Sequence, residues 1–533
     1  MLKKFAKMAV ISCLILALAG GGSLQAESDF LNLVQRGSYS EIRQALEEGA
    51  DVNQQNEAGK TPLMLAATKN SDARVIDLLL DYGARMERRD NRGRTALYHA
   101  VRENPRTSVT RRLIARGAAI NITTDEGYTP LLRAAASSSR EKVELLLGSG
   151  ARPDQRSPEG RTALMILLEG DPSPFLLRRI LNAGASVRIS DNSGNTPLHF
   201  AAKNSKNVDI ISLLLERSAN LEARNNLGQT PLLLAAAHNG EVEIMTHLLK
   251  EGADIEAVDR EKKGVLHQAV TGPSAREKVA RLAARTELDI DQTDRDGNTA
   301  LHLALQERRP DYDLIAELLD AGSDPDMANN RGNTPLMILA EKSDRAGLFS
   351  LLLEAGADAD RAGRLGITPL MLAAENTASE EVIFTLLEAG AEVVREDNRG
   401  RKVVDYLEGN RDLLNTDAYW ELQYMEPAER QLDKLDIKSN RQATLRGLAV
   451  PSLGHAYADS WWPRGALFLA GEAAALGMAL TRDESSDALP FYIAFGVLKA
   501  LEIFDVNRRV DDFNEMAEDY NMRVEEFNRR YQD

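Results

Sequence analysis

The sequence has a single cysteine, few aromatic residues and no long run of one charge sign. Cys13 is the one cysteine among 533 residues, and aromatic residues make up 5% of the chain. The formal net charge is −16 at pH 7. Because binding to nucleic-acid phosphates needs clustered Lys and Arg, this charge argues against nucleic acid as a partner. The chain is also too long for one ordinary hydrophobic core, so we expect several domains or a repeat array.

Residues 1–26 have the pattern of a secretory signal. Three lysines, Lys3, Lys4 and Lys7, precede an apolar stretch, and Ala26 suits cleavage. Cleavage there would remove Cys13, so the exported chain could form neither a disulfide nor a thiol metal site. An exported chain without disulfides favours a bacterial periplasm or cell envelope. Lipidation of Cys13 and an uncleaved signal anchor are the alternatives.

The dominant feature of residues 27–410 is a repeat with a period of about 34 residues. A glycine stands two positions before almost every copy of its anchor, and an apolar segment such as "LLLDYGAR" follows the anchor. The anchor is Thr-Pro-Leu or a close variant and begins at Thr61, Thr95, Thr129, Thr162, Thr196, Thr230, Thr299, Thr334 and Thr368, with weaker copies at Gly264 and Lys402.

Each repeat predicts two helices and a turn. Threonine is a favoured N-cap residue, and proline at the first helical position costs no hydrogen bond, because that N–H is unpaired anyway. The "LMLAA" segment predicts a first helix with a narrow apolar face, and "VIDLLL" predicts a second helix with a bulkier core. The glycine of "DYGA" suits a left-handed helix end, and the Asp-Asn-x-Gly stretch that follows suits a turn.

These motifs resemble the ankyrin repeat over about residues 29–410. The resemblance implies an all-α ankyrin-repeat solenoid of helix-turn-helix units with β-turn tips, which a small α-helical hairpin domain follows here. Residues 29–53 resemble a polar N-terminal capping unit, and "RKVVDYLEGN" resembles a closing cap. One departure is that inter-helix segments such as "KNSD" and "SSSR" are longer than usual, and we expect no change of fold from it.

An ankyrin array implies a protein partner, bound along the turn tips and the first helices. Several of the side chains in these places are arginines on an acidic chain, which favours a partner with acidic patches. The alternative is that they are solvated turn residues. The candidates are Glu57, Arg92, Arg94, Glu126, Tyr128, Arg161, Asn195, Gln229, Asn298, Arg331, Asn333 and Arg401.

The sequence contains none of the short motifs of common catalytic or cofactor sites. It has no H-E-x-x-H, no G-x-S-x-G, no P-loop and no dinucleotide-binding fingerprint. His99, His199, His267 and His302 lie in or near first helices, where we expect them to bond to neighbouring backbone. We therefore predict that the protein is not an enzyme and needs neither a cofactor nor a metal.

Residues 446–505 contain two apolar segments around the acidic turn "TRDESSDALP". The first segment begins with Trp461 and Trp462, which suit a membrane interface, but it is short for a bilayer and contains Glu472. Glu472 and Lys499 lie at nearly equal distances along the chain from Ser485, so an antiparallel hairpin would pair their charges and lower the cost of insertion. The alternatives are a membrane-associated hairpin over residues 461–504 and a helical hairpin in a soluble bundle.

The flanks of this hairpin carry two further patterns. "PSLGHAY" (Pro451 to Tyr457) resembles the P-G-x-G-Q-x-Y-like motif of an uncharacterised bacterial apolar-hairpin domain, with departures at Ser452 and His455, and this resemblance favours the membrane interpretation. Residues 411–445 predict a helical linker. Residues 506–533 predict an amphipathic helix, whose heptad spacing over 506–531 suits either weak self-association or packing back onto the chain.

Together these features predict an exported, non-catalytic scaffold of the bacterial cell envelope. The ankyrin-type array would bind a protein, and the C-terminal hairpin would anchor the array. The alternative is a soluble secreted protein that binds a host or competitor protein, with the C-terminal domain as a folded cap.

Overall fold

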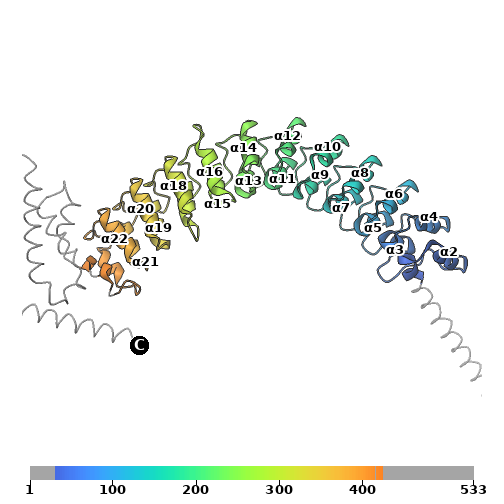
Figure 1. Cartoon of the computed structure of the whole chain (residues 1–533), viewed down its shortest axis with the longest axis horizontal. Coiled ribbons are helices and arrows are strands. Elements are labelled where there is room, and N and C mark those ends of the chain that lie inside the picture. The colour runs from blue at the N-terminus through green and yellow to red at the C-terminus, as the bar shows by residue number, and fades with distance from the viewer. Residues whose placement is uncertain (1–29, 415, 420, 424–533) are drawn as a thin grey trace, which may run out of the picture. The chain divides into compact units, whose positions relative to one another are not determined.

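A computed structural model describes residues 30–414, 416–419 and 421–423, and every regular element among them is a helix (Figure 1). The all-α prediction is therefore confirmed for this part of the chain. The signal at 1–26 lies outside the described residues, as do most of the linker, the hairpin at 446–505 with Trp461, Trp462, Glu472 and Lys499, and the helix at 506–533. The described residues fall into two compact units, which divide between Asp324 and Pro325.

In unit 1, a helical stretch at residues 30–36 precedes α2 (Tyr39–Glu47). Each repeat then supplies a first helix, which follows the threonine anchor, and a second helix. The first helices are α3 (Pro62–Lys69), α5 (Ala96–Glu103), α7 (Pro130–Ala136), α9 (Ala163–Glu169), α11 (Pro197–Asn204), α13 (Pro231–His238), α15 (Val265–Thr271) and α17 (Ala300–Gln306). The second helices are α4 (Arg74–Asp81), α6 (Thr107–Ala115), α8 (Arg140–Gly148), α10 (Pro174–Asn182), α12 (Val208–Glu216), α14 (Val242–Lys250), α16 (Ala275–Ala283) and α18 (Tyr312–Asp320).

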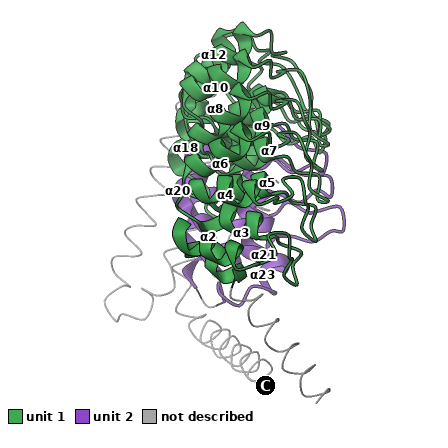
Figure 2. Ribbon diagram, turned by 90° about the vertical axis from the view of Figure 1, so that its right-hand side faces the viewer, with its two compact units in different colours: residues 1–324 green, residues 325–533 purple. Residues whose placement is uncertain are grey.

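Unit 2 continues the same alternation. Its first helices are α19 (Pro335–Lys342), α21 (Pro369–Asn376) and the short α23 (Val403–Leu407). Its second helices are α20 (Ala346–Glu354) and α22 (Glu380–Glu388). Within each unit, first helices pack on neighbouring first helices and second helices on second helices. Figure 2 shows the turn tips of unit 1 together on one side of the stack. We call the surface made by these tips and the first helices the tip face.

The threonine anchors begin the first helices as the sequence predicts. The hydroxyl of Thr61 accepts a hydrogen bond from the backbone N–H of Met64 at 3.3 Å, and Pro62 takes the first helical position. Thr61 is only 2% exposed, so its hydroxyl satisfies a buried N–H that water could not reach. The Leu and Ala side chains that follow are buried between neighbouring first helices.

The glycines of the repeat serve two different needs. Gly83 ends α4 with φ of 88°, a left-handed conformation that strains other residues. Gly59 lies in a turn tip with φ of 74° and has a second constraint, because a Cβ there would come within 2.9 Å of the backbone nitrogen of Asn91 in the next repeat. A side chain at Gly59 would therefore push adjacent tips apart.

Ser218 occupies the position of Gly83 in its own repeat and has φ of 61°. Replacing Ser218 with glycine is expected to raise the free energy of unfolding by roughly 0.5 kcal/mol, because relief of left-handed strain outweighs the added entropy of the unfolded chain. The urea midpoint of the full chain measures this effect. Ser149, which ends α8 with φ of −103°, provides the control. Ser149→Gly should lower the midpoint, and a rise in both variants would contradict the strain argument.

The two ends of the described array are covered differently from its middle. At the start, Phe30 and Val34 are 4% and 0% exposed, although no Thr-Pro-Leu anchor precedes them. At the end, residues beyond α23 continue to pack, since Ala418 and Leu422 are both fully buried. The backbone N–H of Ala418 donates to Glu380 Oε2 at 3.0 Å, which ties this segment to α22.

The segments between first and second helices contain a recurring buried asparagine. Asn104, which is 1% exposed, donates from Nδ2 to the carbonyl oxygens of Ala67 at 3.0 Å and Asn70 at 3.1 Å in the preceding repeat. Asn239 does the same with Ala202 and Ser205, at 2.9 and 2.8 Å. The asparagine at the end of one first helix therefore donates hydrogen bonds to the last carbonyl groups of the preceding first helix.

Two repeats without this asparagine use a buried lysine instead. Lys142 in α8 donates from Nζ to Val101 O at 2.8 Å and Asn104 O at 2.6 Å, the carbonyls that an asparagine would otherwise reach. Lys278 in α16 donates to Ala236 O at 2.6 Å and Ala235 O at 3.2 Å and is fully buried. The residue at the asparagine position beside it is Gly272, where an added Cβ would lie 2.6 Å from Ala236 O.

Candidate partner-binding site

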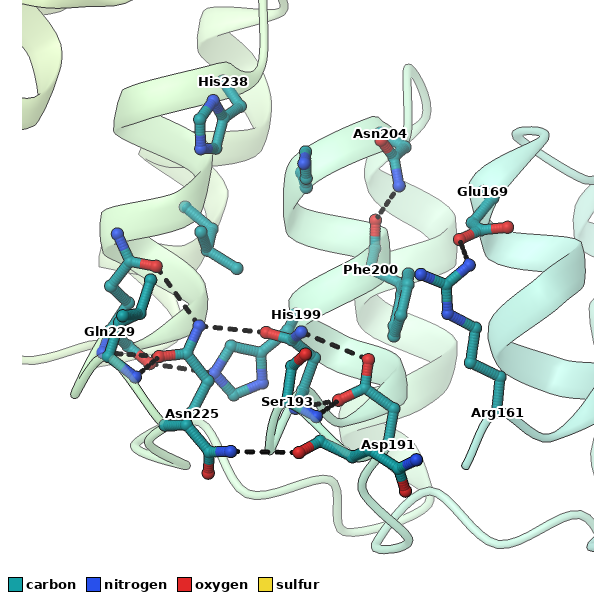
Figure 3. A pocket seen from close by; sticks show the side chains of 16 residues that line it. Arg161, Glu169, Asp191, Ser193, His199, Phe200, Asn204, Asn225, Gln229 and His238 are labelled. Atoms are coloured by element: carbon teal, nitrogen blue, oxygen red, sulfur yellow. Dashed lines mark hydrogen bonds and ion pairs between the residues drawn. The ribbon is translucent and has the colours of Figure 1, made fainter. Parts of the chain in front are cut away.

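A pocket of about 700 Å³ lies on the tip face of unit 1 (Figure 3). Its walls come from three successive repeats, namely from the first helices α9, α11 and α13 and from the turn tips that precede them. A site of this kind needs neighbouring repeats in contact, because its lining comes from three of them. The pocket lining is Arg161, Glu169, Asp191, Asn192, Ser193, Asn195, His199, Phe200, Lys203, Asn204, Asn225, Asn226, Leu227, Gln229, Leu234 and His238.

One wall of the pocket is an ion pair beside an aromatic ring. Arg161 Nη1 lies 2.5 Å from Glu169 Oε1, and the guanidinium carbon lies 5.6 Å from the centre of the Phe200 ring. In Figure 3 the Arg161 and Phe200 side chains lie next to each other. The arginine and glutamate side chains are 37% and 39% exposed, so solvent screens the pair and it contributes little stability. Its main effect is to orient both side chains and to neutralise Glu169.

The tip end of the pocket is a connected set of amide and carboxylate groups. Asp191 accepts hydrogen bonds from the backbone N–H groups of Ser193 at 2.9 Å and Asn195 at 2.7 Å. Asn225 donates from Nδ2 to Asn195 Oδ1 at 2.9 Å and to Gln229 Oε1 at 3.2 Å. The carboxylate of Asp191 therefore holds its own turn, and the amides join two adjacent tips. Beside them, Leu227 is 63% exposed, which is unusual for a leucine on this surface.

The opposite end of the pocket is cationic. Lys203 and His238, from the last turns of α11 and α13, are both exposed there. Burial of the ring lowers the pKa of His238, and the positive charges of Lys203 and Lys278 lower that pKa further. No carboxylate of the described residues forms an ion pair with Lys203. Near pH 7 the positive charge at this end of the pocket is therefore that of Lys203, and the His238 ring is neutral.

The buried histidines bond to neighbouring groups, as expected from the sequence. His199 Nδ1 accepts from the backbone N–H of Thr196 at 3.1 Å, so Nε2 carries the proton and donates to Gln229 O at 3.0 Å. His267 repeats this arrangement with Gly264 and Asn298. Burial lowers the pKa of both rings, which keeps them neutral near pH 7. They connect adjacent repeats and leave no ring nitrogen for catalysis or metal binding.

His99 has a different environment. Its Nε2 donates to Asp90 Oδ2 at 2.9 Å, and Arg94 Nε donates to the same oxygen at 3.0 Å. Burial lowers the pKa of His99 despite the nearby carboxylate. The cluster holds the turn tip of its repeat.

Three of the residues predicted as partner contacts come together in the pocket, namely Arg161, Asn195 and Gln229. Four further predicted contacts are exposed in the turn tips, namely Glu57, Arg92, Glu126 and Arg331. Others are bound within the array: Arg94 and Asn298 are 9% and 8% exposed and bond to Asp90 and Asp294. Tyr128 donates to Glu159 at 3.0 Å, Asn333 donates to Glu341 at 3.3 Å, and Arg401 bonds to Asp397 and Tyr406. Arg94 and Asn298 offer little surface to a partner.

Sequence reasoning missed Phe200, Lys203, Leu227 and His238. The position in the repeat could have found the first two, since they lie four and seven residues after the Thr196 anchor and so share one face of α11. The signal for Leu227 is an apolar residue in a turn tip that is otherwise polar, "NNLGQ".

No group of three or more His, Cys, Asp or Glu side chains in the described part of the chain could hold a metal ion. Between residues 30 and 423, with 415 and 420 left aside, no helix combines the length and apolar character needed to cross a membrane.

Comparison with protein families gives one match, and comparison with curated proteins gives none. The sequence model described as ankyrin repeats (3 copies) matches residues 30–123, 168–259, 236–319 and 307–397. These stretches cover more than half of the chain. Residues 124–167, which are not matched, contain α7, α8 and the start of α9 in the same alternation of helices.

Proposed function

Because this chain belongs to the ankyrin-repeat family, we propose that the pocket over α9, α11 and α13 is where its array binds a protein partner. Ankyrin repeats mark a protein-binding scaffold, and the family is typically non-catalytic. The observation that supports the pocket as the place of binding is an exposed apolar side chain, Leu227, in a turn tip at one end, together with Lys203 at the other end, which forms no ion pair among the described residues. A partner can bury an apolar anchor there and pair its charges at the far end.

We further propose that the scaffold works at the bacterial cell envelope and is held there by residues 446–505. The signal-like residues 1–26 and the apolar segments around "TRDESSDALP" support this location. Trp461 and Trp462 would lie at the membrane interface, and Glu472 would pair with Lys499. The alternative location is the medium, where the protein would bind a protein of a host or competitor.

Cell fractionation tests the location. The full chain is expected to stay with bacterial membranes after a carbonate wash, whereas a chain that ends after residue 423 is expected to be released. Residue 423 is the right end point because it keeps the buried Ala418 and Leu422. Release of both chains into the periplasm would overturn the anchor, and recovery of the full chain from culture medium would establish the secreted alternative.

A further inference from the structure

We propose that the pocket recognises an extended, acidic segment of its partner, with one carboxylate side chain between Lys203 and His238 and an apolar side chain on Leu227. This inference rests on the proposed function and adds the chemistry of the partner. Three features of the described residues carry it: the Lys203 ammonium group beside His238 at one end, the bonds that the two acids of the pocket already make, and the exposed leucine at the other end.

The cationic end consists of Lys203 from α11 and the ring of His238 from α13. Lys203 and His238 line the pocket, and the fully buried Lys278 lies behind them, with Nζ 2.6 Å from the carbonyl oxygen of Ala236 in α13. The charges of Lys203 and Lys278 both act on His238. An incoming carboxylate would therefore meet the Lys203 ammonium group and the His238 ring, which is a favourable site for a charge-assisted hydrogen bond.

Neither acid of the pocket pairs with Lys203. Glu169 is paired with Arg161 at 2.5 Å. Asp191 accepts bonds from Ser193 N, Asn195 N and Asn195 Nδ2, so its lone pairs are directed into its own turn. The whole chain has a net charge of −16, which repels acidic segments in general. A lysine without an ion pair, Lys203, in a pocket of such a chain selects where an acidic segment can bind.

The polar and apolar parts of the pocket suit an extended chain. Leu227 lies in the turn tip with Asn225 and Gln229, and Asn195 lies in the preceding tip, whereas Lys203 and His238 lie in the last turns of α11 and α13. Figure 3 shows Asn225 and Gln229 at one end of the pocket and His238 at the other. These amides can exchange part of their bonds with each other for bonds to a peptide backbone. A segment that spans the pocket would then place an apolar residue and an acidic residue a few positions apart.

A displayed library of random dodecapeptides, selected on the full chain, tests the partner chemistry. The enriched peptides are expected to contain Asp or Glu a few residues from an apolar residue. A synthetic peptide of the consensus should bind Lys203→Glu at least about tenfold more weakly than the unchanged chain, the loss of one charge-assisted contact. Lys206→Glu is the matched control, because Lys206 is exposed three residues after Lys203, just beyond the end of α11, carries the same charge and does not line the pocket. Its effect should be below about twofold.

Further readouts separate recognition from folding. The affinity of Lys203→Gln for the consensus peptide is compared with the thermal midpoint of each variant. This comparison shows whether Lys203 acts only by stabilising the end of α11. A consensus peptide with Lys in place of its acidic residue should bind Lys203→Glu more tightly than it binds the unchanged chain. A purely structural role of Lys203 would not produce this reversal of affinity.

Each remaining outcome counts against a defined claim. Enriched peptides without acidic residues, or equal losses from Lys203→Glu and Lys206→Glu, overturn the carboxylate inference and leave the scaffold proposal in place. Enriched peptides that match an acidic segment of this chain would replace an outside partner with a second copy. No enrichment over an unrelated protein would overturn both the inference and the pocket as the binding site.

Discussion

Replacing Asn104 with alanine is expected to lower the local stability of the array by about 3 kcal/mol. The change removes the two bonds to Ala67 O and Asn70 O and leaves both buried carbonyls without that partner. It also removes the acceptor Oδ1 for the backbone N–H of Arg106 at 2.9 Å. Each buried group left unpaired costs about 1–3 kcal/mol. Hydrogen exchange of peptides from α3 and α5 in the full chain measures the loss, because opening of a repeat array is local.

Asn91 provides the control for Asn104. It is exposed in a turn tip, and its Nδ2 donates to Glu57 O at 2.9 Å, also in the preceding repeat. Water can replace that bond, so Asn91→Ala should cost less than about 1 kcal/mol. Equal losses in the two variants would show that burial of the bridge is unimportant.

The stability of the array is expected to rise between pH 7.5 and 9.5, and Lys278 is expected to account for about 2 kcal/mol of this rise. Burial lowers the pKa of Lys278 from 10.5 in the unfolded chain to about 8. Between these two values the unfolded chain binds a proton that the folded chain does not, so stability increases with pH. The increase ends as pH approaches 10.5. Urea unfolding of the full chain at both pH values measures it.

Lys278→Met is the comparison for this pH dependence, because it keeps the apolar stem and removes the titrating group. The difference in free energy of unfolding between the unchanged chain and Lys278→Met should grow by about 2 kcal/mol in favour of lysine from pH 7.5 to 9.5. Burial lowers the pKa of Lys142 as well, and this contribution is the same in both chains and cancels. A difference that stays constant with pH would mean that Lys278 remains charged in the folded array.

Much of the fold follows from local sequence. The Thr-Pro anchors start the first helices, and glycines such as Gly83 end the second helices, because capping and left-handed turns depend on residues within one repeat. The roles of Asn104 and Lys278 could not be predicted in this way. Their acceptors lie in the preceding repeat, 34 or more residues away. Two unlike side chains, an asparagine and a lysine, donate to carbonyl groups at the end of a first helix.

The candidate site was predictable only in part. Arg161, Asn195 and Gln229 follow from their places in the turn tips, and all three line the pocket. Arg94 has the same place in its tip, but it is only 9% exposed. Its guanidinium group donates to Asp90 Oδ2, which also accepts a hydrogen bond from His99, and this bonding keeps Arg94 buried. The exposure of a tip residue depends on which side chains of the neighbouring first helix contact it. The spacing of the repeat does not predict these contacts.

The sequence by itself determined the period, the helix boundaries and the ankyrin family of this protein, because each depends on contacts within one repeat or between identical neighbours. Only the tertiary structure decided which side chains meet across repeats. Stacking places Lys203 of one repeat beside His238 of the next and the buried Lys278 behind them. The pocket arises from that stacking, since its lining comes from three successive repeats.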